Sequence, residues 1–210
     1  MLNFDAIAAA ETRTEPFTYI AASGALSSDQ AAAVRADYPE ISKTGYLPLS
    51  KLSAQGEFKA LIDDLQSPRL AEVLSERLNL DLIDKPRMIT VRKLSKIGDG
   101  RIHNDSVSKI CTRLVYLNDK WDPEEGGAIR ALNGDENMDD YAEEVAPVAG
   151  NVFAFARSDT SWHGHPPFAG ERYVIQTTFL TSQEELDRKE NRGGLQYLLK
   201  KLNPFEGKRG

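Results

Sequence analysis

Five short segments rich in β-branched and aromatic residues follow one another in the middle of the chain, and they constrain its fold most strongly. They cover residues 88–94, 110–117, 128–132, 151–156 and 172–181. Turn-forming residues, chiefly Gly, Asn, Asp and Pro, separate them. Segments of this composition are typical of β-strands, and many short strands joined by turns favour a β-sandwich or a barrel. Residues 87–181 therefore predict a strand-rich core.

The preceding segment, residues 1–86, predicts a mainly helical flank. Residues 27–30, Ser-Ser-Asp-Gln, fit a capping box before an alanine-rich stretch. Ser67 and Pro68 supply an N-cap and an N1 proline for a second helix start. Two sets of apolar residues fall at helical spacing: Phe58, Leu61, Ile62 and Leu65, and then Leu70, Val73, Leu74 and Leu78. We expect both sets to pack against the sheet.

Residues 182–210 predict a C-terminal helical tail. Residues 182–185, Ser-Gln-Glu-Glu, fit another capping box. Leucines then recur at near-helical spacing, at Leu195, Leu198, Leu199 and Leu202. The Gly193-Gly194 pair should break this helix in two, and residues 207–210 should fray.

Length and composition favour a single soluble domain over residues 1–210. The net charge of −6 argues against a general nucleic-acid or anionic-membrane surface. No run approaches the ~20 apolar residues of a membrane span, and the N-terminus is a poor signal peptide. The one cysteine, Cys111, cannot form an internal disulfide, and we expect a buried, inert thiol there. A reducing, cytoplasmic setting fits these features.

The segment Arg101-Ile-His-Asn-Asp105 places a histidine and an aspartate two residues apart. Side chains at i and i+2 of a strand share one face, so His103 and Asp105 can reach one metal from a strand or its end, while Asn104 points away. A second strand would bring in His163. Two imidazoles and one carboxylate are the ligands of a non-heme Fe(II) site with open positions. Alone, such a triplet is a weak signal, and its alternative is an exposed loop.

Arg172 is the second polar feature, because it opens an otherwise apolar strand segment. Such an arginine can extend to solvent or pair with a surface acid. It can also place two parallel hydrogen bonds on a ligand carboxylate.

Taken together, these motifs resemble the Fe(II)/2-oxoglutarate-dependent dioxygenases, and within them the prolyl-hydroxylase-type (prolyl 4-hydroxylase-like) branch. The resemblance covers about residues 87–181 and rests on residues 103–105, 114–121, 126–127, 161–163 and 170–173. It implies an α+β fold: a double-stranded β-helix (jelly-roll) core, N-terminal helices packed on its sheet, and a C-terminal helix.

The resemblance also implies the roles of individual residues. His103, Asp105 and His163 bind Fe(II), Arg172 binds the 5-carboxylate of 2-oxoglutarate, and Tyr116 contacts the same cosubstrate. The implied enzyme uses dioxygen to hydroxylate an unactivated C–H bond, with succinate and CO2 as co-products, and ascorbate stays open as a further cofactor. The family often has a second tyrosine about ten residues before the HxD motif. Residues 91–95 contain none, so the contacts to the cosubstrate must differ there.

An alternative reading is a cupin-like metal-binding β-barrel with a role independent of 2-oxoglutarate. There His163, His165 and Glu171, with His103 as a possible fourth ligand, would hold the metal. The HxD reading is favoured because it gives Arg172 and Tyr116 a function. On that reading we expect His165 at the mouth of the site, as a substrate contact or a rim residue. The substrate is open between a peptidyl proline, an amino acid and another metabolite, and the oligomeric state is open too.

Residues 135–144 carry six acidic side chains and no basic one. A calcium loop would need Gly at its sixth position and Glu at its twelfth, and those positions hold Asp140 and Ala146. We therefore expect a solvated loop between strands. The functional alternative is a mobile flap that selects a basic or polyhydroxy substrate.

Overall fold

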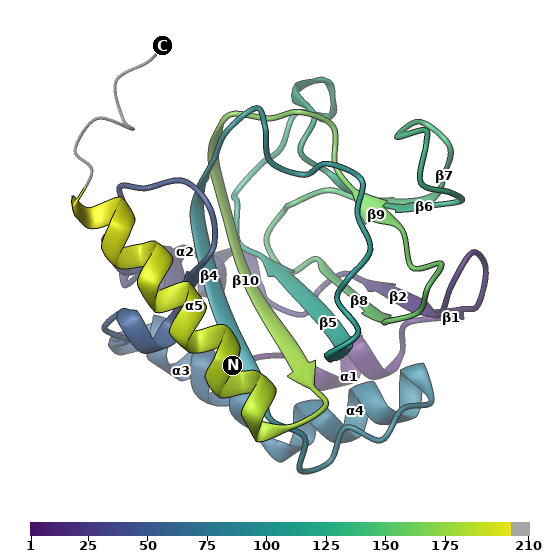
Figure 1. Ribbon diagram of the computed structural model, residues 1–210, viewed down its shortest axis with the longest axis horizontal. Coiled ribbons are helices and arrows are strands. Elements are labelled where there is room, and N and C mark those ends of the chain that lie inside the picture. Colours follow the sequence, from purple (N-terminus) through teal and green to yellow (C-terminus); the bar gives the residue numbers. More distant parts are fainter. Residues whose placement is uncertain (203–210) are drawn as a thin grey trace.

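The computed structural model describes residues 1–202 and the side chains of residues 1–192. Its core is two antiparallel sheets. The larger has seven strands in the order β1-β2-β8-β5-β10-β4-β3, and the smaller has three in the order β7-β6-β9. Figure 1 shows the N-terminal helices on one side of β4 and β10 and helix α5 on the other.

All five expected strands are present, with ends shifted by at most two residues. They are β4 (Arg87–Ser95), β5 (Lys109–Tyr116), β6 (Ile129–Leu132), β8 (Val152–Ala156) and β10 (Gly170–Leu180). Five short strands were not expected: β1 (Thr12–Arg13), β2 (Tyr19–Ala22), β3 (Leu47–Pro48), β7 (Tyr141–Val145) and β9 (His163–Gly164). They carry little sequence signal because pairing with a neighbouring strand determines their conformation.

The expectation of a loop over residues 135–144 is partly wrong, since β7 begins at Tyr141 and pairs with β6. Arg130 of β6 explains how acidic residues are accommodated there. Its Nε donates to Glu144 on the opposite strand, and its Nη1 donates to Asp139 at 2.7 Å. A cross-strand pair of opposite charges stabilises such a ladder.

Four helices precede β4: α1 (Phe4–Ala8), α2 (Ser28–Ala36), α3 (Gly56–Gln66) and α4 (Pro68–Leu78). The predicted capping box of α2 is confirmed, because Ser27 Oγ accepts from Gln30 N–H and Gln30 Oε1 accepts from Ser27 N–H. Ser67 caps α4, with Pro68 at N1. The short 3-10 helices η1 (Leu49–Lys51) and η2 (Pro123–Glu125) complete the loops.

Helix α5 (Gln183–Leu202) runs without interruption through Gly193-Gly194, so the predicted break is wrong. Glycine weakens a helix by about 1 kcal/mol relative to alanine, but unlike proline it keeps its N–H and does not block the hydrogen-bond ladder. The expected leucine stripe lies among side chains that are not described, and residues 207–210 lie outside the described chain. Among the described helices, none combines the length and apolar character that a membrane span requires.

Two apolar layers flank the seven-stranded sheet. One packs α1–α4 against the sheet and includes Val91, Cys111 and Ile175; the other lies between the two sheets and includes Leu114 and Phe155. Cys111 is fully buried as expected, and burial raises the pKa of its thiol to about 12. Because strand side chains alternate, one face of β4, β5 and β10 is directed toward the space between the sheets.

Candidate active site

The HxD motif lies in the segment between β4 and β5, outside any strand. His103 instead forms an isolated antiparallel bridge with His163. Its N–H donates to the carbonyl of His163 at 3.0 Å, and the N–H of His163 donates back at 3.1 Å. Asn104 is directed elsewhere, where its Oδ1 accepts from Ser161 Oγ at 2.9 Å. His103 and Asp105 are therefore positioned by a loop that is hydrogen-bonded to β9, and not by a strand or its end as expected from the sequence.

His103, Asp105 and His163 each place a potential ligand atom within 4.8 Å of the other two, and no other group of His, Cys, Asp or Glu in the described chain does so. Each histidine Nδ1 lies 2.9 Å from a backbone carbonyl, of Arg101 and Ser161 respectively. A carbonyl only accepts, so Nδ1 carries the proton and Nε2 offers its lone pair. Burial, with His103 nearby, lowers the pKa of His163 to about 4, so its imidazole is neutral at pH 7, as a metal ligand must be.

Asp105 is buried, with 5% of its surface exposed. Thr112 donates to its Oδ2 at 2.6 Å, and the Lys109 ammonium donates to its Oδ1. Burial acts to raise the pKa of Asp105, but Lys109, His163 and Thr112 together hold it below its usual value. Each oxygen of an ionised carboxylate has two acceptor sites, so one is left for a metal. Two imidazoles and this carboxylate fit Fe(II).

The three residues line a cavity of about 220 Å³, which Arg172 also lines. Arg172 is 1% exposed. Its Nε donates to the carbonyl of Gly127 at 2.8 Å, and one Nη donates to Tyr116 Oη at 3.3 Å. These bonds use two of the five guanidinium donors and leave three for a ligand. Tyr116 is fully buried, and in this structure its hydroxyl supports Arg172.

Arg92 and Tyr46 line the same cavity and were missed in the sequence. Arg92 lies in the stretch that lacks the family tyrosine, and its guanidinium carbon is 4.2 Å from the centre of the Tyr46 ring. Tyr46 reaches this point because Leu47 of β3 pairs with Val91 of β4. The only local signal for Arg92 was its charge, and Arg87 and Lys93 of the same strand share it. Tyr46 had no local signal.

His165 also lines this cavity, and its side chain lies inside rather than on the rim, with 4% exposed. Its Nδ1 donates to the carbonyl of Pro166 at 2.8 Å, and its Nε2 has no hydrogen-bond partner among the described residues. Burial and the nearby Arg172 lower its pKa to about 4. Gly100, at φ +78°, makes room for the ring, because a Cβ there would lie 2.3 Å from it.

The cupin-like ligand set is contradicted by the position of Glu171. Glu171 is absent from the lining of the cavity that Arg172 lines, and it lines a separate cavity instead. Its side chain is 59% exposed, and its Oε1 lies 3.6 Å from Lys93 Nζ. Neither Glu171 nor His165 joins the metal-ligand group.

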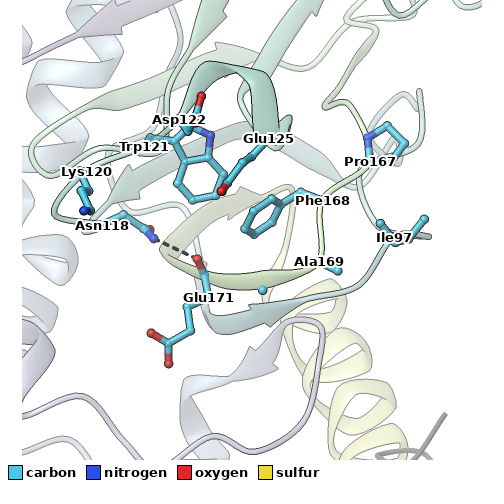
Figure 2. A pocket seen from close by; sticks show the side chains of 11 residues that line it. Ile97, Asn118, Lys120, Trp121, Asp122, Glu125, Pro167, Phe168, Ala169 and Glu171 are labelled. Carbon is cyan, nitrogen blue, oxygen red and sulfur yellow. Dashed lines mark hydrogen bonds between the residues drawn. The ribbon is translucent and has the colours of Figure 1, made fainter. Parts of the chain in front are cut away.

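The cavity that Glu171 lines is larger, at about 790 Å³, and Figure 2 shows it. The rings of Trp121 and Phe168, 4.5 Å apart, form its apolar part. Asn118 donates to the backbone carbonyl of Glu171 at 3.0 Å. No histidine lines this cavity among the described residues. Within the described residues, the candidate metal ligands therefore line the smaller cavity and not this one.

Residues 92–180 match the family model described as the 2OG-Fe(II) oxygenase superfamily. The matched segment contains all three triad residues together with Tyr116 and Arg172. No curated protein is significantly similar in sequence.

Several solved structures are similar in fold. A prolyl 4-hydroxylase from Phytophthora capsici has a TM-score of 0.53 at 19% identity, over 77% of this chain and 58% of that one. A prolyl-4-hydroxylase from Pseudomonas putida has a TM-score of 0.51 at 20% identity, over 84% and 90%. A prolyl hydroxylase from Trichoplax adhaerens, in complex with a hypoxia inducible factor peptide, has a TM-score of 0.53 at 15% identity, over 79% and 87%. The match thus spans little more than half of the Phytophthora enzyme. Residues 92–180, less than half of this 210-residue chain, are thus similar to the 2OG-Fe(II) oxygenase superfamily, and the similarity to solved structures extends to the fold.

Proposed function

We propose that this oxygenase hydroxylates an unactivated C–H bond, with His103, Asp105 and His163 as the Fe(II) ligands and Arg172 as the anchor of 2-oxoglutarate. One observation carries the proposal: the triad and a buried arginine line the same cavity. The triad alone would fit many iron proteins. A buried guanidinium with three free donors adds a site for a second carboxylate of the cosubstrate.

The residues of this chain have separate tasks. The free donors of Arg172 bind the 5-carboxylate bidentately, and Tyr116 holds the guanidinium in place. Lys109 and Thr112 orient Asp105 through its two oxygens. Leu114, Ile129 and Phe155 form an apolar wall that limits water in the cavity. When bound, Fe(II) supplies the activation of dioxygen that couples decarboxylation of 2-oxoglutarate to succinate with hydroxylation of the substrate.

His103 is exposed whereas Asp105 and His163 are buried, so the metal position opens to solvent on the His103 side. We assign the approach of substrate to this side. We keep a prolyl residue of a peptide and a small metabolite as the two substrate classes to test, and the Trichoplax relative is seen in complex with a peptide.

We further assign the two facing sheets to a double-stranded β-helix within a single domain. Their facing apolar layer and the fold likeness support this assignment. The N-terminal helices pack on the outer face of the larger sheet. A single buried cysteine fits a cytoplasmic setting.

The test is an assay of 2-oxoglutarate consumption by the Fe(II)-loaded protein. The wild type should release succinate slowly without substrate, faster with the right substrate pool, and N-oxalylglycine should inhibit competitively. Asp105→Ala is the matched inactive control, because it removes a proposed ligand and keeps both histidines. If no pool links 2-oxoglutarate loss to a product, the proposed reaction is wrong.

A further inference from the structure

A third cavity, of about 450 Å³, lies between helix α5 and the inner face of the seven-stranded sheet. Thr90 of β4 and Thr178 of β10 lie on its sheet side, and Arg188, Lys189 and Arg192 come from α5. We call it the α5 groove. Figure 1 shows α5 running alongside β4 and β10 at this point. None of the mechanism described above uses these residues.

The α5 groove is contiguous with the metal cavity. Tyr46, Lys109 and Gln176 line both. Lys109 lies between the two cavities, and its ammonium donates to the proposed iron ligand Asp105. These three side chains form the border that a ligand in the groove would have to cross to reach the triad.

The lining of the α5 groove carries four cationic side chains, Lys109, Arg188, Lys189 and Arg192, and no acidic one among the described residues. This concentration is unusual for a chain with a net charge of −6. Burial, followed by the proximity of Lys109 and Arg188, lowers the pKa of Lys189. Like charges are thus crowded here, and an anion would relieve their repulsion.

Thr90 supplies an independent indication of a ligand. It is only 8% exposed, and its Oγ1 has no hydrogen-bond partner in the described part of the chain. Buried hydroxyl groups are nearly always paired, so an unpaired one in a cavity indicates a missing partner atom.

The alternative is that Arg188, Lys189 and Arg192 serve only to hold α5 against the sheet. One contact fits that view: Lys189 Nζ donates to Ser106 Oγ at 3.0 Å. Docking would be served by acids on the sheet, yet the described lining offers none. The two acids nearby are already paired, Asp105 with Lys109 and Glu185, on α5 itself, with Arg188 at 2.6 Å. Docking also leaves Thr90 unexplained.

We propose that the α5 groove binds a carboxylate or phosphate group of the substrate, whose reacting carbon lies in the metal cavity. The inference rests on the proposed function, since it names the substrate class of the same site. Arg188, Lys189 and Arg192 supply charge-assisted donors to the anion, and Thr90 Oγ1 donates a further hydrogen bond. An anionic group held beyond Gln176 would then orient the substrate toward the triad.

The test is an NMR titration of ¹⁵N-labelled protein loaded with Zn(II) and 2-oxoglutarate, so that Arg172 is occupied. The probes are methyl phosphate and acetate, in separate arms that distinguish the two anion sources. At least one should give saturable shifts centred on Thr90, Thr178 and Lys189. Shifts spread evenly over exposed cations of the protein would overturn the proposal.

Two groups of variants sharpen this test. Arg188→Gln/Lys189→Gln/Arg192→Gln should weaken the preferred anion at least about tenfold, as expected for lost charge-assisted bonds. The control Arg13→Gln/Lys59→Gln/Arg69→Gln removes three cations that are 54%, 56% and 54% exposed and makes the same charge change. Its affinity should stay within about twofold. Equal losses in both triple variants would contradict the assignment.

Thr90→Val replaces the hydroxyl with a methyl group and should lower the affinity for the same anion several-fold. Unchanged affinity would remove Thr90 from the site.

In parallel, the anionic fraction of a substrate pool should stimulate succinate release more than the neutral fraction. Failure of the proposed function is seen separately, as absence of any 2-oxoglutarate consumption by the wild type. The NMR titration reports on the groove in either case.

Discussion

The backbones of His103 and His163 are hydrogen-bonded to each other in both directions, at 3.0 and 3.1 Å. This bridge joins a loop to the small sheet and brings the two imidazole rings to 4.2 Å between centroids. Because backbone atoms make it, the bridge survives side-chain substitution. Variants of the triad should therefore report on metal binding rather than on loop position.

The first prediction separates the triad from His165. His163→Ala and His103→Ala should each abolish stoichiometric Fe(II) binding, measured by anaerobic calorimetry. His165→Ala should keep it, because His165 lies outside the ligand group. Retention of iron by Asp105→Ala together with its loss in His165→Ala would reverse the assignment.

Tyr116→Phe tests whether the Tyr116 hydroxyl holds the Arg172 guanidinium in place. It removes the acceptor of the 3.3 Å bond from the guanidinium and keeps the ring. A typical hydrogen bond contributes about 0.5–1.5 kcal/mol, so 2-oxoglutarate affinity should fall about two- to tenfold. Iron affinity should be unchanged. A thousand-fold loss would instead indicate that Tyr116 contacts the cosubstrate directly.

Gly127 should be intolerant of a side chain. Its φ is +79°, a Cβ would lie 2.7 Å from the Trp121 ring, and its carbonyl accepts from Arg172. Gly127→Ala should destabilise the protein by at least about 1–3 kcal/mol in urea unfolding and weaken 2-oxoglutarate binding. Gly134→Ala is the matched control, because a Cβ there meets nothing within 4 Å. Equal effects of the two substitutions would show that the region around Arg172 is adaptable.

Acid should destabilise the metal-free protein through its buried histidines. The pKa of His165 is lowered from 6.5 to about 4, and that of His163 likewise. As the pH falls through this window, the unfolded chain binds protons that the folded chain does not, so the free energy of unfolding decreases. At about 1.36 kcal/mol per pH unit, each histidine contributes up to about 3 kcal/mol.

His165→Gln should therefore remove about half of this pH dependence, measured by urea unfolding in chelator between pH 6.5 and 4. The lowered pKa of Asp105 acts in the same direction but below its usual value of 3.8, outside the window. An unchanged slope in the variant would mean that His165 is protonated in the folded protein.

The strands that could be predicted are those whose own composition determines them. β4, β5 and β10 are long and rich in β-branched residues, so local preference and tertiary pairing agree. β3 has two residues, and only its pairing with β4 defines it. Tyr46 was missed for that reason, since its place beside Arg92 depends on a contact between distant segments. β7 was missed because its acids are stabilised by Arg130, which lies outside the segment.

Motif spacing identified the candidate site residues that the structure brings together, but it did not predict their environment. Nothing local indicated that His165 would lie inside the cavity, because Gly100 from another loop makes its space. The cationic lining of the α5 groove was equally hidden. It combines residues of β5 and α5 that are about eighty positions apart in the sequence.

The central claim is that the triad and Arg172 hold iron and 2-oxoglutarate in one cavity. An anaerobic titration of the Fe(II) protein with 2-oxoglutarate, followed by its visible charge-transfer band, tests both parts at once. The wild type and His165→Ala should develop the band, and His163→Ala should not. Losing one partner of a buried charge pair costs about 2–5 kcal/mol, so Arg172→Ala should require roughly 30-fold to several thousand-fold more 2-oxoglutarate, with Arg172→Lys between. Wild-type affinity in Arg172→Ala, or no band in the wild type, would contradict the account.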